Sequence, residues 1–326
     1  MKRKLPKWAL PLLFIIILYM LPLFISSQYV LRICVYITIY SILSCSLNLI
    51  SGVAGQVSMG HSAFYGIGAY ASTLIAMSFG VPWFVCLIFA FVFAFIVGVL
   101  IGIPSLRLKG GYLCICTQGF AELVRLILLN WVSVTRGPMG LTNIPRPVLF
   151  GIQIRTNSQY FYVSLTLFLL VFFLLRNIIR SKFGRNLRAI KEDDVAAEVM
   201  GIRVHREKVI AFSLAAGLAG IAGSMLAHYM VFISPTLFTS DFSTQILSMV
   251  VLGGMGSMPG CIIATTLLTA IPEALRSLNE YRMLIYGLLL IFMMLAKNVD
   301  WSVTVPGKAL GRLKTSISGT YARITG

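Results

Sequence analysis

Apolar stretches long enough to cross a membrane, separated by short polar segments, follow one another along most of this 326-residue chain. A helix needs ~20 apolar residues to span the hydrocarbon core of a bilayer. The pattern therefore predicts an all-α, polytopic membrane helix bundle. About ten spans are expected, near residues 8–25, 30–50, 57–78, 83–103, 105–130, 159–178, 208–230, 241–257, 260–276 and 281–297. Eight or nine spans with re-entrant pieces fit the same pattern.

The first apolar stretch follows four basic residues within positions 1–7, as in a secretory signal peptide. It is longer than the apolar core of such a peptide, and Ser26, Ser27 and Gln28 make a poor cleavage site. We therefore expect an uncleaved first span after a short cytoplasmic tail, residues 1–7.

Residues 179–208 are the one long, highly charged segment, between the spans in 8–178 and those in 209–297. Together with Arg176 they hold nine of the 27 lysines and arginines, and they hold five of the ten acidic residues. A polar segment of this size must face water. The simplest interpretation is a basic stop signal that keeps it in the cytoplasm.

The charged segment also carries the signals of two short helices. Leu187, Ile190 and Ala197 fall at helical spacing, and Arg188 and Glu192 are expected to form an i,i+4 ion pair. A second helix is expected over residues 195–200. Asp193 or Asp194 can cap its first N–H groups, and Gly201 can end it in the left-handed conformation.

This second helix is too short to be stable alone, because isolated helices need ~12–15 residues in water. We therefore expect its small face, formed by Ala196 and Ala197 with Val199 and Met200 beside it, to lie in a groove of another protein. A stop signal alone does not require the acidic cluster, the alanine pair or the glycine.

Composition excludes several other classes of protein. Charged residues make up 11% of the chain, hydrophobic residues 58%, and the mean hydropathy is +0.90, whereas a soluble domain carries ~25% charged residues. The net charge of +17 does not indicate nucleic-acid binding, because the basic residues cluster at span ends. With the N-terminus in the cytoplasm, 20 of the 27 basic residues fall on the cytoplasmic side. The tail 298–326 is then cytoplasmic too.

Residues 51–70 combine five glycines with polar side chains where the chain re-enters the membrane. Irregular backbone at that depth is tolerated only inside the protein or beside a cavity, and interrupted helices mark the pathway of many transporters. The alternative is close helix packing through small residues, which explains the glycines but not Gln56, Ser58 and His61.

Glu122 and Arg125 lie one helical turn apart inside another apolar run. A charge in mid-bilayer costs ~2.5–3.5 kcal/mol, so the two are expected to pair or to face a polar interior. Alternatively, they lie near the outer surface as ordinary interfacial groups. Residues 251–260 predict a tight turn between two spans, and residues 131–158 form a long outer loop, either a docking surface or a passive connector.

Two smaller patterns concern helix ends and helix packing. Ala216, Gly220 and Ser224 recur every four residues, which predicts a close helix contact through small residues. Asp241 is expected to cap the helix that begins beside it.

The chain lacks the motifs of the common enzyme classes, and no catalytic residue is expected. It has no Walker A motif, no His-Glu-x-x-His and no Gly-x-Ser-x-Gly. Its three histidines are far apart in sequence, and its six cysteines all lie in apolar runs, where small buried filler is the usual role. No metal or cofactor is therefore expected in this chain, and any ATP would be bound by partner subunits.

Four motifs resemble one family in its own order: GQVSMGHSAFYGIGAY at 55–70, RLKGGY at 107–112 leading into AELVR at 121–125, LRAIKEDDVAAEVMG at 187–201, and VLGGMGS at 251–257. The family is the LivH/LivM permeases of branched-chain amino acid ABC importers, and the resemblance is closer to the LivM type. One departure is TRGPMGL at 135–141, where Arg136 and Met139 differ from the family's usual Thr-Gly-Gly-Pro-Asn-Gly-Leu.

The resemblance implies a single permease domain, residues 1–326, in the inner membrane with both termini cytoplasmic. It implies a heterodimer with a sister permease, two cytoplasmic ATPases, and a periplasmic binding protein that delivers branched-chain amino acids. The expected contacts with an ATPase are Arg188, Glu192, Asp193, Asp194, Ala196, Ala197, Glu198 and Gly201. The expected pathway residues are Gln56, Ser58, His61, Tyr65 and Glu122.

Three alternatives remain. Related permeases carry urea or short amides through the same architecture. A secondary transporter or channel would act without an ATPase, although intramembrane acids are few for an ion relay. A structural membrane scaffold would need no pathway, which fits the glycine-rich interrupted segments poorly.

Overall fold

The computed structural model describes residues 18–23, 27–108, 110–149, 151–274, 287–288 and 291. Contacts group residues 1–274 into one compact unit and residues 275–326 into another. In the second unit only residues 287–288 and 291 are described, and they are helical. Most of the predicted first and last spans and the tail 298–326 lie outside the described residues.

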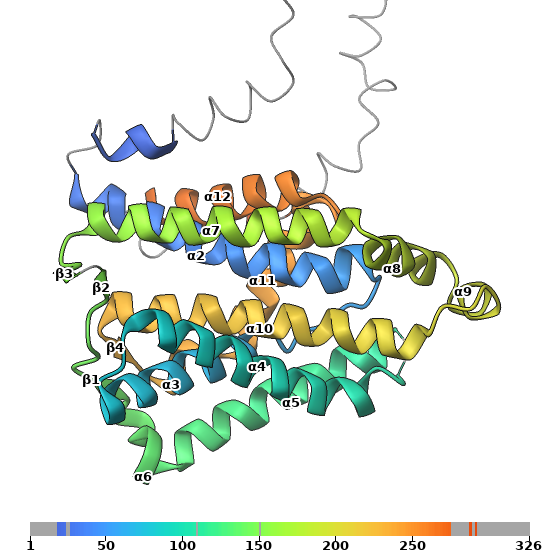
Figure 1. Cartoon of the computed structure of the whole chain (residues 1–326), viewed down its shortest axis with the longest axis horizontal. Coiled ribbons are helices and arrows are strands. Elements are labelled where there is room, and N and C mark those ends of the chain that lie inside the picture. The colour runs from blue at the N-terminus through green and yellow to red at the C-terminus, as the bar shows by residue number, and fades with distance from the viewer. Residues whose placement is uncertain are drawn as a thin grey trace, which may run out of the picture. The chain divides into compact units, whose positions relative to one another are not determined.

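The larger unit is built almost entirely of helices, which confirms the all-α prediction (Figure 1). Its helices are α2 (Gln28–Asn48), η1 (Leu49–Val53), α3 (His61–Phe79), α4 (Trp83–Ser105), α5 (Gly111–Asn130), α6 (Val132–Thr135), η2 (Gly137–Met139), α7 (Asn157–Arg180), α8 (Lys182–Glu192), α9 (Asp194–Val199), α10 (Val204–Met230), η3 (Pro235–Leu237), α11 (Ser240–Gly253) and α12 (Met258–Ala274). Its strands have two residues each: β1 (Leu141–Thr142) pairs antiparallel with β4 (Phe232–Ile233), and β2 (Val148–Leu149) with β3 (Ile152–Gln153).

Five helical stretches in the described part of the chain are long and apolar enough to cross a membrane: Gln28–Val53, Trp83–Ser105, Gly111–Asn130, Asn157–Arg180 and Val204–Met230. They match five of the expected spans. The chain is therefore a multi-pass membrane protein. Helix α11 ends at Gly253, four residues before the expected end of that span, because Gly254 takes a left-handed φ of 91°.

Helix α10 packs against α3 and α4 on one side and against α2 on another (Figure 1). Gly220 allows the close contact with α4, because a Cβ atom there would lie 2.5 Å from the carbonyl oxygen of Ala90. Similarly, a Cβ atom on Gly68 of α3 would lie 2.2 Å from the Cα atom of Gly220. The predicted contact through small residues is thus confirmed.

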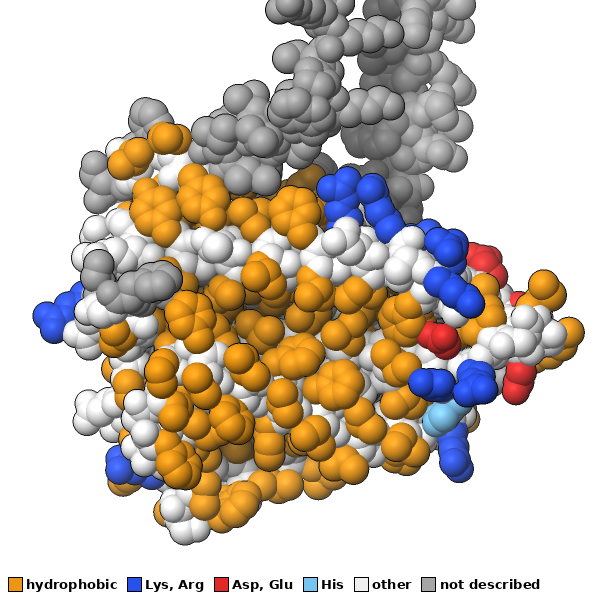
Figure 2. All heavy atoms as spheres, viewed as in Figure 1, with side chains coloured by type: hydrophobic (Ala, Val, Ile, Leu, Met, Phe, Trp, Pro, Cys, Tyr) orange, Lys and Arg blue, Asp and Glu red, His pale blue; other side chains and the backbone are white. Residues whose placement is uncertain are grey.

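Helices α4, α5 and α7 turn wide apolar faces outward. Figure 2 shows hydrophobic side chains covering the middle of one such face, with lysines and arginines gathered mainly at the end that carries α8 and α9. An apolar belt with charge at its ends is the surface expected of a membrane-embedded bundle.

The expected cap at Asp241 is wrong: the Thr239 side chain accepts from the N–H of Phe242, and Asp241 lies inside the first turn.

Candidate functional site

The interruption predicted within residues 51–70 lies between α2 and α3. Helix α2 runs into the π-helix η1, and the chain is then irregular until α3 begins at His61. Gly55 lies in this irregular stretch with a φ of 72°, a conformation that glycine adopts without strain. The span expected from residue 57 therefore begins four residues later.

The turn between α11 and α12 packs directly on this interruption. The N–H of Gly256 donates to Asn48 Oδ1 at 2.8 Å. A Cβ atom on Gly52 would come within 2.3 Å of the nitrogen of Gly256. The predicted turn at residues 251–260 is thus confirmed, and it supports the unwound part of the span.

The side chain of His61 ties the start of α3 to α2. Its Nε2 lies 2.8 Å from Ser46 Oγ, and Ser46 Oγ donates its own hydrogen to the carbonyl oxygen of Leu43 at 2.8 Å. His61 Nδ1 is buried and has no hydrogen-bond partner among the described residues.

Four of the five expected pathway residues are buried around the interruption: Gln56, Ser58, His61 and Tyr65. Gln56 Oε1 and the hydroxyl of Tyr65 have no hydrogen-bond partner, although buried polar groups in folded proteins are normally paired. Tyr65 packs its ring against Phe238 and Phe242, with centroids 5.4 Å away in both cases. Among the described residues, Gln56 Oε1, His61 Nδ1 and the Tyr65 hydroxyl are thus buried polar atoms without a partner.

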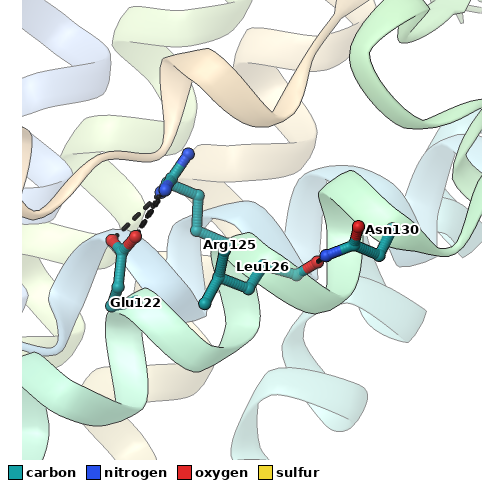
Figure 3. A network of polar contacts seen from close by, with 4 residues as sticks. All are labelled: Glu122, Arg125, Leu126 and Asn130. Atoms are coloured by element: carbon teal, nitrogen blue, oxygen red, sulfur yellow. Dashed lines mark hydrogen bonds and ion pairs between the residues drawn. The ribbon is translucent and has the colours of Figure 1, made fainter.

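Glu122, the fifth expected pathway residue, lies on α5 and is half-buried. Figure 3 shows its carboxylate paired with Arg125, whose Nε lies 2.9 Å from Oε1 and 3.0 Å from Oε2. One turn further on, the side chain of Asn130 donates to the carbonyl oxygen of Leu126. The side chains of Arg125 and Glu122 are 24% and 41% exposed, so the pair is partly exposed.

The charged segment folds as the two expected helices, α8 and α9, at one end of the bundle (Figure 1). Of the two candidate caps, Asp193 is the one used: its carboxylate accepts from the N–H groups of Val195 and Ala196 at 2.8 and 3.0 Å. Gly201 follows α9 with a φ of 83°, as predicted. The helix runs over Asp194–Val199, one residue earlier than expected.

One expected contact in this segment is wrong. Arg188 does not pair with Glu192; its Nη2 donates to the carbonyl oxygen of Ile179 at 3.1 Å. The carbonyl groups at the end of α7 lack helical partners, so a guanidinium finds an acceptor there. Both Arg188 and Glu192 are exposed.

The faces of α8 and α9 differ from the expected ones. Ala197 is 4% exposed and packs within this chain, together with Leu187 and Ile190. The apolar surface that α9 offers outward is instead made by Val195, Val199 and Met200, which are 65%, 82% and 81% exposed. Ala196 and Glu198 are exposed beside them.

Two polar contacts join the charged segment to the membrane helices. Lys191 Nζ donates to the carbonyl oxygen of Gly52 at 2.9 Å, and Lys208 Nζ pairs with Asp194 at 2.7 Å. A cavity of about 330 Å³ lies between the segment and the interruption, and Gln56 is among its lining residues. The interruption and the charged segment therefore form one continuous site.

The part of the chain that the structure describes holds no group of three or more His, Cys, Asp or Glu side chains that could bind a metal ion. None of the six cysteines forms a disulfide with another described residue.

A family model described as "Branched-chain amino acid transport system / permease component" matches residues 29–294. The chain belongs to this family. It is 38% identical over 280 residues to the high-affinity branched-chain amino acid transport system permease protein LivM of Escherichia coli K12, a match covering 79% of this chain and 66% of that protein. The chain thus spans somewhat less than two thirds of its LivM relative.

Two further relatives show the range of the family. The permease protein LivH of Salmonella typhimurium is 29% identical, over 78% of this chain and 88% of LivH. The autoinducer 2 import system permease protein LsrC of Salmonella paratyphi B is 31% identical, over 49% of this chain and 46% of LsrC. No solved structure matches the chain.

Proposed function

We propose that the chain is the permease subunit of an ATP-driven importer and forms part of the translocation pathway for branched-chain amino acids delivered by a periplasmic binding protein. The identity with LivM over most of the chain supports the transport class. The observation that carries the mechanism is the bond from Lys191 to the carbonyl of Gly52, because it connects a water-facing segment to an interrupted span.

The exposed apolar patch of α9 is the contact for a cytoplasmic ATPase in this proposal. Val195, Val199 and Met200 would be covered by that subunit, and Glu198 would lie at the edge of the contact. A six-residue helix held by one cap and one glycine has little stability of its own, so packing against a partner would fix its position. ATP is bound by that partner, and this chain holds no cofactor.

The orientation follows from the same proposal. The charged segment lies in the cytoplasm, the N- and C-termini lie on the same side, and the membrane is the inner membrane of a bacterium. The gathering of lysines and arginines at the α8 and α9 end of the bundle supports this orientation (Figure 2).

A sister permease would cover the outward face of α5. The pair between Glu122 and Arg125 is partly exposed on this subunit, and charges are costly in lipid, so the pair would face a second subunit or a water-filled path. Glu122 would then line the path between the two permeases. When the interruption moves, the path would also be lined by the buried polar groups of Gln56, Ser58, His61 and Tyr65.

This pathway can be tested by placing a cysteine at Gln56 in a chain whose native Cys116 is replaced by serine. A small aqueous thiol reagent should label the new cysteine in one nucleotide state of the complete importer and not in the other. Equal protection in both states would show that the interruption is only helix packing.

The importer itself is tested by reconstitution into liposomes. The chain, a sister permease, two ATPases and a loaded binding protein should take up leucine only when ATP is supplied. Uptake by the purified chain without any ATPase would establish a secondary transporter or channel instead. Uptake of urea or short amides in place of leucine would keep the architecture and change the solute.

A further inference from the structure

A second cavity lies at the opposite end of the bundle from α8 and α9, where α2 and α7 begin and α10 ends (Figure 1). Its volume is about 390 Å³. Three arginines line it, one from α2 and two from the loop before α7: Arg32, Arg146 and Arg155. We call it the arginine pocket.

Among the described residues, none that lines the arginine pocket is acidic. The partners that its guanidinium groups have in this part of the chain are all neutral. Arg146 donates to the carbonyl oxygen of Arg155, Arg155 donates to the side chain of Gln153, and Arg32 lies 5.3 Å from the ring centre of Tyr29. Glu273 accepts a hydrogen bond from Tyr29 and does not line the pocket. Among the described residues, no ion pair joins these arginines to a carboxylate, although Glu273 is close enough to Tyr36, which lines the pocket, to interact with it.

The start of α7 adds to this positive charge. Thr156, which caps the helix, and Asn157, its first residue, both line the pocket. The N-terminus of a helix carries a partial positive charge and favours anions. For a helix of 24 residues, this contribution acts in the same direction as the three guanidinium groups.

His228 gives an independent indication that the pocket is a binding site. It lines the pocket, is 2% exposed, and its Nε2 has no hydrogen-bond partner within the described part of the chain. Its Nδ1 lies 2.8 Å from the carbonyl oxygen of Pro145. A carbonyl can only accept, so Nδ1 carries the hydrogen and Nε2 of the neutral ring is an acceptor. A buried acceptor of this kind is normally paired.

We infer that the arginine pocket binds a zwitterionic group, with an anionic oxygen group on the guanidinium side and an N–H donor on Nε2 of His228. Guanidinium groups bind carboxylates and phosphates through charge-assisted hydrogen bonds. Two sources carry this chemistry: a free α-amino acid, and the ethanolamine headgroup of a phospholipid. The inference depends on the pocket alone and not on the proposed ATP-driven transport.

The test uses the full-length chain, with the subunits that co-purify with it, in nanodiscs. Phosphatidylcholine nanodiscs provide the phosphate without an N–H donor, and tritiated leucine is added as the free amino acid. In parallel, mixed nanodiscs of phosphatidylcholine and phosphatidylethanolamine are examined by native mass spectrometry for retained lipid. The variants are Arg32→Gln with Arg155→Gln, and separately His228→Phe. Arg180→Gln, at the other end of α7, is the control.

If the source is the amino acid, leucine binds in phosphatidylcholine nanodiscs, and both pocket variants weaken binding at least tenfold while Arg180→Gln does not. If the source is the lipid, phosphatidylethanolamine is retained over phosphatidylcholine, and both pocket variants lose that preference. The inference is overturned if neither ligand is preferred, or if the control variant weakens binding as much as the pocket variants. An unchanged thermal unfolding midpoint identifies variants that remain folded.

Discussion

The contact from Lys191 to Gly52 gives the sharpest prediction, and Lys191→Met is the change that tests it. Methionine keeps the unbranched stem, which packs beside Gly55: a Cβ atom on that glycine would lie 2.8 Å from Lys191 Cγ. The ammonium group is lost, and the buried carbonyl of Gly52 loses its donor. The variant thus removes the polar link and retains most of the packing.

The size of the effect follows from the burial of the two partners. Leaving a buried acceptor unpaired costs ~1–3 kcal/mol. Because Lys191 is exposed, water also solvates its ammonium group and weakens the hydrogen bond. The lower part of that range, about 1–1.5 kcal/mol, therefore applies. Two elements can influence each other only through the free energy of the contacts that differ between their states. Losing about 1–1.5 kcal/mol changes the equilibrium between the coupled and uncoupled arrangements of the charged segment and the interrupted span by roughly fivefold to tenfold.

The assay is the ratio of leucine taken up to ATP hydrolysed, in liposomes that contain the complete importer. Lys191→Met should lower this ratio fivefold to tenfold while the ATPases remain bound. Arg185→Met is the matched control: it removes a charge from the same helix, where Arg185 donates only to the carbonyl oxygen of Arg180 at 3.4 Å. A normal ratio in Lys191→Met, or an equal fall in the control, refutes the reasoning.

Three further predictions follow from single positions. Gly201→Val places a β-branched residue at a φ of 83° with nothing within 4 Å of the new Cβ, so it adds backbone strain of ~1–2 kcal/mol. This strain should destabilise the end of α9 and lower uptake about fivefold to thirtyfold, while membrane insertion, measured by fractionation, stays normal. Gly220→Ala should lower the thermal unfolding midpoint, because the new Cβ would lie 2.5 Å from the carbonyl oxygen of Ala90. Gly119→Ala, with open space around it, should leave the midpoint unchanged. Equal midpoints for the two variants would contradict the close contact between α10 and α4 at Gly220. Glu122→Leu leaves Arg125 unpaired and should reduce the amount of inserted protein, and adding Arg125→Leu should restore it; no recovery would mean that the carboxylate acts alone.

Local signals in the sequence were enough to predict the parts of the site that depend on neighbouring residues. Asp193 and Gly201 define the ends of α9 because caps act over three or four residues. The glycines of residues 51–70 predict an interruption, because that much glycine weakens a helix wherever it is placed. The small residues of α10 predict a close contact without naming its partner helices.

The contacts that join the site could not be predicted, because their partners are distant in sequence. Lys191 and Gly52 are 139 positions apart, and no pattern in either segment points to the other. Arg188 was expected to bind Glu192, but the unpaired carbonyl of Ile179 at the helix end competes for the same guanidinium. The arginine pocket likewise depends on three segments that meet only in the folded chain.

The central claim is that α9 lies against an energy-supplying subunit and is held in place by it. In a background with Cys116→Ser, cysteines at Val199 and Met200 should crosslink to a nucleotide-hydrolysing protein in native membranes. A cysteine at Met139 should not, because this residue, which is 83% exposed, lies in η2 directly after α6, and α6 is at the other end of the bundle (Figure 1). Capture of such a protein by both α9 positions is the predicted result. Capture of no nucleotide-hydrolysing protein by either position would contradict the account.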